Sequence, residues 1–359
     1  MKSSHPDNRR HLHILAALDV GGIERHVLDR VCRQRRQGIE SDFLLLGMRR
    51  GPLCDEAERM GCRIHNIPSR RSPLAYHRGL RKFFSGHKGV YSTVTLSGTS
   101  LTTVAPLAEA RRAGIPERII HIHNTSCRGL HNRILHMLNR LRIASLATCW
   151  HACSEEARIW GYAGSGVLHK ARVVANAVSA SRFRFNPQRR QLTRERLGLA
   201  HNMVIGHIGR FSPEKNHMRL LRLFRHLSGM QPSARLLLVG GGPLEEEVKE
   251  MARCLGIADK VVHAGLVPDP ESMLDAMDCL VMPSHFEGLP YVMVEAQVSG
   301  LPAVVSDSIR PEADVGGDVT FLSLADPDSL WTETIADRAG KTRPDRADAY
   351  RSLDARYLL

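Results

Sequence analysis

Arginine and lysine stand together in a loop that follows an apolar, strand-like segment in the second half of the chain. The loop reads GRFSPEKNH over residues 209–217, and it follows NMVIGHI at 202–208. Arginine offers a planar fork of donors and lysine a compact charge, so Arg210 and Lys215 could together neutralise a diphosphate and the charge that builds on a leaving group. The alternative is a surface loop with ordinary charges.

Two carboxylates accompany a second loop, HFEGLPYVMVEA at 285–296, which follows the apolar segment DCLVMP. Pro290 suits the first position of a helix, which places Glu287 in the loop before it and Glu295 in its second turn. The free amides around Gly288 and Leu289 would crowd the same end. The two carboxylates are suited to accept hydrogen bonds from sugar hydroxyls, one set from a ribose and one from a hexose. A solvated helix terminus with acids favoured by the helix dipole is the alternative.

Weaker signals lie in the first half. Gly21 and Gly22 follow the strand-like HLHILAAL and precede a helical pattern, so the backbone could approach a ligand closely there. The stretch HIHNTS at 121–126 ends another strand, and alternation places His121 and His123 on one face. His123 could donate to a bound sugar, or it could be a core or surface histidine.

The elements that must position these loops are short apolar strands alternating with helices. One series runs from residue 11 to about 178, and a second runs from 202 to 306. This pattern predicts an α/β protein with parallel sheets covered on both faces. We expect two Rossmann-like domains with parallel sheets facing a central cleft, at residues 1–185 and 186–340. The polar, Arg-rich stretch 179–193 is interpreted as a linker, and residues 341–359 as a terminal helix that crosses back to the first domain.

Charge and composition limit the classes of partner that the protein could bind. Of the 359 residues 24% are charged, and the net charge of +13 divides into +19 over residues 1–190 and −6 over 191–359. Aromatic residues are only 5%, and no basic–aromatic platform for stacking bases stands out, which argues against nucleic acid. The eight cysteines are scattered in apolar stretches, typical of reduced thiols in a cytoplasmic protein. Neither a secretory signal nor an 18-residue apolar run is apparent.

One helical stretch is both apolar and basic. Over Arg128–Ile143, apolar residues recur at helical spacing between arginines and histidines. Such a helix could lie on anionic lipid headgroups, or it could pack on the sheet with a solvated basic face. The first interpretation places the protein at the inner face of the cell membrane as a peripheral protein.

Taken in order, these stretches resemble the retaining glycosyltransferases of family four, which have the GT-B fold. The resemblance extends from Gly21 to about Leu330, and it is carried by GRFSPEKNH, LLLVGGGPLEEEV, the spacing of Glu287 and Glu295, and EAQVSGLPAVVSD. The stretches HIHNTS and HACSEEA are similar to the branch that builds capsular polysaccharides and exopolysaccharides.

The resemblance implies a metal-independent hexosyltransferase without a cofactor. It would move a sugar from a nucleotide sugar, with UDP favoured, to a lipid-linked or oligosaccharide acceptor with retained anomeric configuration. The roles that it implies cover both halves of the chain. In the second half, Arg210 and Lys215 would hold the diphosphate, and Glu295 would bind the ribose. Glu287 would bind the transferred sugar with the amides of Gly288 and Leu289, and the segment His263–Val267 would frame the nucleobase. In the first half, the backbone of Gly22 would approach the distal phosphate, and His123 would lie over the sugar.

Two other functions stay open. One is a nucleotide-sugar epimerase of the same fold. The other is a non-catalytic scaffold that binds a nucleotide sugar within a membrane polysaccharide assembly.

Overall fold

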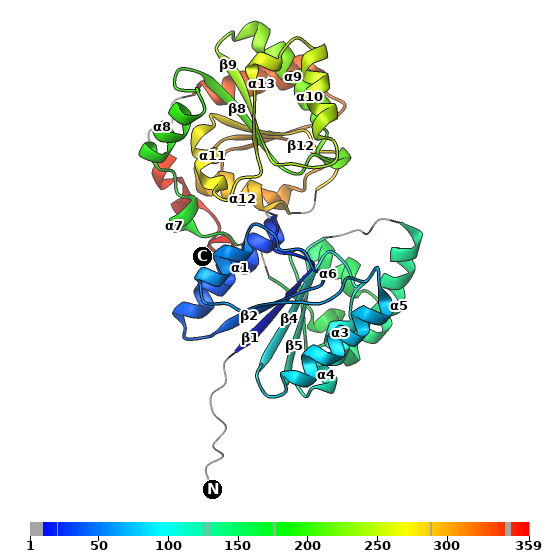
Figure 1. Cartoon of the computed structure of the whole chain (residues 1–359). Helices are drawn as coiled ribbons and strands as arrows, with labels where there is room; N and C mark the ends of the chain where they lie inside the picture. Colours follow the sequence, from blue (N-terminus) through cyan, green and yellow to red (C-terminus); the bar gives the residue numbers. More distant parts are fainter. Residues whose placement is uncertain are drawn as a thin grey trace. The chain divides into compact units, whose positions relative to one another are not determined.

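The computed structural model describes residues 10–19, 21–124, 127, 129–174, 177–287, 289–341 and 346–358. It divides the chain into two compact units, Met1–Ala175 and Asn176–Leu359, which are described separately (Figure 1). Each unit is built around its own parallel sheet.

The sheet of the first unit has seven strands in the order β3-β2-β1-β4-β5-β6-β7, all paired in parallel. Strand β1, which lies between β2 and β4, reads HLHIL, and all five of its residues are buried, as expected for a strand covered on both faces. In chain order the strands are β1 (His11–Leu15), β2 (Ser41–Leu45), β3 (Ile64–Asn66), β4 (Thr93–Gly98), β5 (Glu117–Ile122), β6 (Cys149–Ala152) and β7 (Arg172–Val173).

Helices cover both faces of this sheet, with α1 on one side and α3, α4 and α5 on the other (Figure 1). Alternate residues of one strand supply the two cores: Leu12 and Ile14 pack with the α3 side, and Leu15 packs with the α1 side. The helices are α1 (Gly22–Arg36), α2 (Cys54–Arg59), α3 (Pro73–Gly86), α4 (Ala105–Arg112), α5 (Leu130–Leu146) and α6 (Glu155–Tyr162), with a 3-10 turn at Leu168–Lys170.

The sheet of the second unit has six parallel strands in the order β10-β9-β8-β11-β12-β13. Its register follows the apolar runs, with β8 at the centre pairing β9 on one side and β11 on the other. The strands are β8 (Met203–Ile208), β9 (Ala234–Val239), β10 (Val261–Gly265), β11 (Cys279–Met282), β12 (Ala303–Ser306) and β13 (Val319–Leu322).

Two cores flank this second sheet. One is formed with α9, α10 and α13, and the other with α11 and α12 on the opposite face (Figure 1). The helices are α7 (Ala180–Phe183), α8 (Pro187–Arg196), α9 (His217–Met230), α10 (Glu245–Cys254), α11 (Pro270–Ala276), α12 (Tyr291–Val298) and α13 (Asp328–Gly340). Short 3-10 turns lie at Pro213–Lys215, Ala258–Lys260, Pro311–Ala313, Arg346–Ser352 and Ala355–Tyr357.

The parallel α/β architecture expected from the strand–helix alternation is confirmed. The boundary between the units, however, lies ten residues before the one drawn at residue 185. The supposed linker at 179–193 includes α7 and most of α8, and Phe183 is buried in the core of the second unit. Its arginines form ion pairs with carboxylates of the same unit, for example Arg189 with Asp275 at 2.5 Å.

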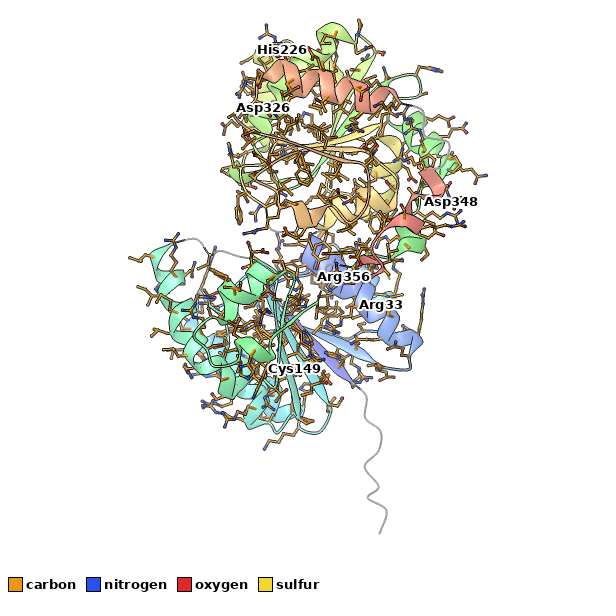
Figure 2. The ribbon with its side chains drawn as sticks, turned by 180° about the vertical axis from the view of Figure 1, so that it is seen from behind. Arg33, Cys149, His226, Asp326, Asp348 and Arg356 are labelled. Carbon is orange, nitrogen blue, oxygen red and sulfur yellow. The ribbon has the colours of Figure 1, made fainter. Side chains whose placement is uncertain are left out.

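The C-terminal segment is the other departure from expectation. Residues 346–358 form two 3-10 turns rather than an α-helix, and Figure 2 shows Asp348 and Arg356 on them. This segment packs on the second unit, because Arg346 is buried and donates to the carbonyl oxygens of Leu274, Met277 and Ser299. None of the helices within the described ranges is long and apolar enough to cross a bilayer.

Candidate functional site

The loops that follow β8, β9 and β10 are bound to one another at the carboxyl edge of the second sheet. The amide of Phe211 donates to the Gly241 carbonyl at 3.1 Å, and the amide of Gly240 donates to the Gly265 carbonyl at 2.8 Å. Gly240 has a φ of 135°, and a Cβ there would collide with the carbonyl oxygen of Gly209. The close contact therefore requires glycine at position 240.

The loop that carries Lys215 is fastened to the loop that follows β11. Asn216 adopts a left-handed conformation, with φ 55° and ψ 48°, and its side-chain amide donates to the Pro283 carbonyl at 2.9 Å. The amide of His285 donates to the Glu214 carbonyl at 2.8 Å. These bonds bring together two segments that lie about 70 residues apart in the sequence.

Lys215 and Glu287 meet at this junction. The Lys215 ammonium donates to Oε1 of Glu287, and the Ser284 hydroxyl donates to the same oxygen at 3.1 Å. Both charged side chains are largely buried, with 15% and 12% exposed. Arg210 lies on the same loop as Lys215, and its side chain is exposed. The structure thus places one cation of this loop in an ion pair and leaves a second cation of the same loop open to solvent.

The other predicted residues of the second unit lie on neighbouring elements. Glu295 is buried in the second turn of α12, as expected, although the helix begins at Tyr291 and Pro290 is its N-cap. Leu289 is half-buried before this helix, and Gly288 lies outside the described residues. Val267, after β10, is half-buried against the core.

In the first unit, Gly22 lies seven residues after the end of β1, and His123 lies directly after the end of β5. Gly22 is the first residue of α1. His123 follows β5, and its ring stacks on His121 with centroids 3.9 Å apart, which confirms that the two share a face. The ring of His26 on α1 lies edge-on to His123, 6.0 Å away. Burial, with His26 and Arg30 nearby, holds the pKa of His123 well below its usual range, so the ring is neutral at neutral pH.

Several residues around these sites were not singled out from the sequence. His26, His207, His217 and Ser284 all contact or neighbour a predicted site residue. The signal for the histidines is a polar residue at an inward position of an apolar strand or helix. Within the ranges that the structure covers, no group of three or more histidine, cysteine and acidic side chains is arranged to hold a metal ion.

Comparison with known proteins agrees with this architecture. The family described as "Glycosyl transferase 4-like domain" matches residues 21–177, and "Glycosyl transferases group 1" matches residues 190–319. The crystal structure of Anabaena HepE in complex with UDP has a TM-score of 0.74 and 19% identity, over 97% of this chain and 95% of HepE.

Similarity to curated sequences shows the family to which this chain belongs. A GDP-mannose-dependent phosphatidylinositol monomannoside mannosyltransferase of Mycolicibacterium smegmatis is 34% identical over 166 residues, or 43% of this chain and 44% of that enzyme. The putative glycosyltransferase EpsF of Bacillus subtilis is 35% identical over 348 residues, or 94% of this chain and 90% of EpsF. The chain therefore belongs to the GT-B glycosyltransferases, with a family-four-like first domain and a group 1 second domain.

Proposed function

We propose that this glycosyltransferase moves a hexose from a UDP-sugar to a lipid-linked or growing saccharide acceptor, with retained anomeric configuration and without a bound metal ion. Its role would be in the synthesis of a cell-surface polysaccharide. The observation that carries the proposal is the Lys215–Glu287 pair, on a loop that also carries exposed Arg210, at the carboxyl edge of the second sheet. Ligands of parallel α/β sheets bind at this edge.

The donor would bind by an exchange of partners. The diphosphate replaces Glu287 as the partner of Lys215, and Arg210 adds its planar fork to the same phosphates. Glu287 is then available to accept hydrogen bonds from hydroxyls of the transferred sugar, next to the amides of Gly288 and Leu289. These cations stabilise the charge on the departing diphosphate, which is where negative charge accumulates as the bond to the sugar breaks.

The remaining residues would hold the rest of the donor. We assign Glu295 to the ribose hydroxyls and the segment His263–Val267 to the nucleobase. In the first unit, we assign the backbone of Gly22 to the distal phosphate and His123 to the transferred sugar. A neutral imidazole suits this role because it can donate one hydrogen bond to a sugar hydroxyl. Since it carries no positive charge, it does not attract the diphosphate away from the cations of the second unit.

The choice of UDP rests on similarity. The HepE structure contains UDP, whereas the mycobacterial relative is named for GDP-mannose. EpsF covers most of the chain, and the resemblance to exopolysaccharide enzymes favours a UDP-linked donor. We therefore take UDP-hexoses as the first substrates to test and GDP-mannose as the comparison.

The acceptor would be met at a membrane. Five apolar residues of α5 face solvent, with exposed fractions between 49% and 74%: Leu130, Ile134, Met137, Leu138 and Leu141. The side that packs on the sheet is instead formed by His136, Ile143 and Leu146. Arginines border the exposed apolar stripe, so α5 suits contact with anionic lipid at the inner face of the cell membrane. Arg128, at the start of the predicted surface, lies outside the described residues.

The test is a transfer assay with a panel of UDP- and GDP-sugars and undecaprenyl-linked acceptors, with the product anomer read by NMR. We expect transfer with retention, unchanged after EDTA, and a loss of about 100-fold or more in kcat/KM for Glu287→Ala and Lys215→Ala. Lys341→Ala, which removes an exposed pair with Asp337, is the control and should keep full activity.

Other outcomes would point elsewhere. Transfer at the wild-type rate by both site variants would contradict the assignment of Lys215 and Glu287. Epimerised nucleotide sugar without transfer would support the epimerase. Nucleotide binding without turnover across the panel would support the scaffold.

A further inference from the structure

A fully buried histidine lies directly beneath the Lys215 loop. His207 is in β8, and its Nδ1 is 2.9 Å from the carbonyl oxygen of Val281 in β11. A carbonyl oxygen can only accept, so Nδ1 carries the ring hydrogen. Burial, with His217 and Lys215 nearby, keeps the pKa of His207 well below its usual range. In this neutral tautomer Nε2 has a free lone pair, and it has no hydrogen-bond partner among the described residues.

This lone pair lies next to the lysine. A Cβ built on Gly209 would be 3.1 Å from Nε2 of His207 and 3.3 Å from Cε of Lys215. The ring nitrogen and the end of the lysine side chain therefore border the same small space, which exists because residue 209 is glycine. A larger residue there would fill it.

Other buried rings pack near His207. The ring of His217 lies 4.9 Å from His207 and 4.5 Å from Phe211, and all three side chains are buried. Burial and the charge of Lys215 lower the pKa of His217 to about 4, so it is neutral at neutral pH. The negative charge of the neighbouring Glu214 has the opposite effect and raises the pKa of His217, but by less.

We propose that His207 is a positioning residue for Lys215, and that its Nε2 accepts a hydrogen bond from the ammonium group whenever Glu287 releases it. The inference rests on the proposed function, in which Glu287 turns to the hydroxyls of the sugar. Lys215 is only 15% exposed, so an ammonium that loses its carboxylate needs another protein acceptor besides the phosphates. His207 supplies it without a negative charge that would repel the diphosphate.

The first test needs no nucleotide. Glu287→Met removes both acceptor oxygens at similar side-chain length, so Lys215 should turn to His207. In 15N-histidine NMR spectra, Nε2 of His207 should appear as an unprotonated nitrogen in the wild type and move upfield in Glu287→Met. The double variant Glu287→Met/Lys215→Met should not show this movement. A protonated Nε2 in the wild type, or an unmoved signal in Glu287→Met, would overturn the proposal.

The second test measures UDP affinity by calorimetry in a double-mutant cycle. His207→Asn keeps an amide that can donate to Val281 but lacks the Nε2 acceptor. It should weaken UDP binding about tenfold in the wild-type background, as expected for one charge-assisted hydrogen bond, and have no effect in Lys215→Met. An equal loss in both backgrounds would mean that His207 acts only through packing. If the wild-type protein bound neither UDP nor GDP, the proposed function would be contradicted. The NMR test, which needs no nucleotide, would still decide the role of His207.

Discussion

The ion pair between Lys215 and Glu287 joins a cation suited to phosphate with a carboxylate suited to sugar hydroxyls. Both side chains are largely buried, so each needs the other when no ligand is present. Removing one partner leaves the other charge poorly compensated, and the variants of this pair will also lose some stability. Their loss of activity is therefore to be compared with the fraction folded, measured on the same samples.

The first residue-scale prediction concerns Gly240, whose φ of 135° and contact with Gly209 leave no room for a side chain. Gly240→Ala should lower the free energy of unfolding by about 2–4 kcal/mol, measured by urea denaturation. The control is Gly229→Ala, because Gly229 lies in α9 and a Cβ there would meet open space. That change should stabilise the protein by up to about 1 kcal/mol. Equal effects of the two changes would show that the contact with Gly209 is unimportant.

At the scale of elements, the strands could be predicted because parallel strands buried on both faces are continuous apolar runs. Stretches such as ARLLLV and CLVM are strands β9 and β11. The prediction of a linker at 179–193 was wrong, because the arginines of this stretch suggested a solvent-exposed segment. Arg189 and Arg190 are instead paired with Asp275 and Asp278 on the second unit, and a local reading of sequence cannot find partners more than 80 residues away.

The candidate site likewise has a part that could be predicted from the sequence and a part that could not. The loops could be located because glycine, proline and charged residues follow apolar strands. The direct contact of Lys215 with Glu287, and the place of His207 beneath them, depend on the order of strands in the sheet. One sequence does not contain that order explicitly, so these contacts required the structure.

The element-scale prediction concerns α5. Neutralising Arg133, Arg140 and Arg142 together should weaken binding to anionic vesicles by up to about 100-fold in sedimentation, since each arginine near the surface contributes about 1 kcal/mol. The matched control changes three exposed arginines in the last turn of α1, Arg33, Arg35 and Arg36, of which Arg33 is labelled in Figure 2. Equal losses for both triple variants would indicate net charge alone, and unchanged sedimentation of the α5 variant would remove the membrane proposal.

At the scale of the whole molecule, the two units differ in their buried histidines. The first unit holds a group of imidazoles from β1, α1, β5 and β6, several of them in ring contact. Burial lowers the pKa of His11 to about 2, of His13 to about 3 and of His151 to about 4, and the pKa of His121 and His123 also lies well below the usual range. Arg30 adds to the effect on all five. The second unit has fewer such groups, chiefly His207 and His217.

This difference predicts that the first unit is the more sensitive to acid. Unfolded imidazoles take up protons below about pH 6.5 and the folded ones do not, so the unfolding free energy falls as pH decreases from 7.5 to 5.5. Each histidine should contribute about 1 kcal/mol to this loss. Tryptophan fluorescence can separate the units, because Trp331→Phe leaves Trp150 and Trp160 of the first unit, and the double change of those two leaves Trp331 of the second. In urea denaturation the midpoint of the first reporter should fall further than that of the second. Equal shifts, or a first unit that is more stable at pH 5.5, would mean that these histidines are not neutral in the folded protein.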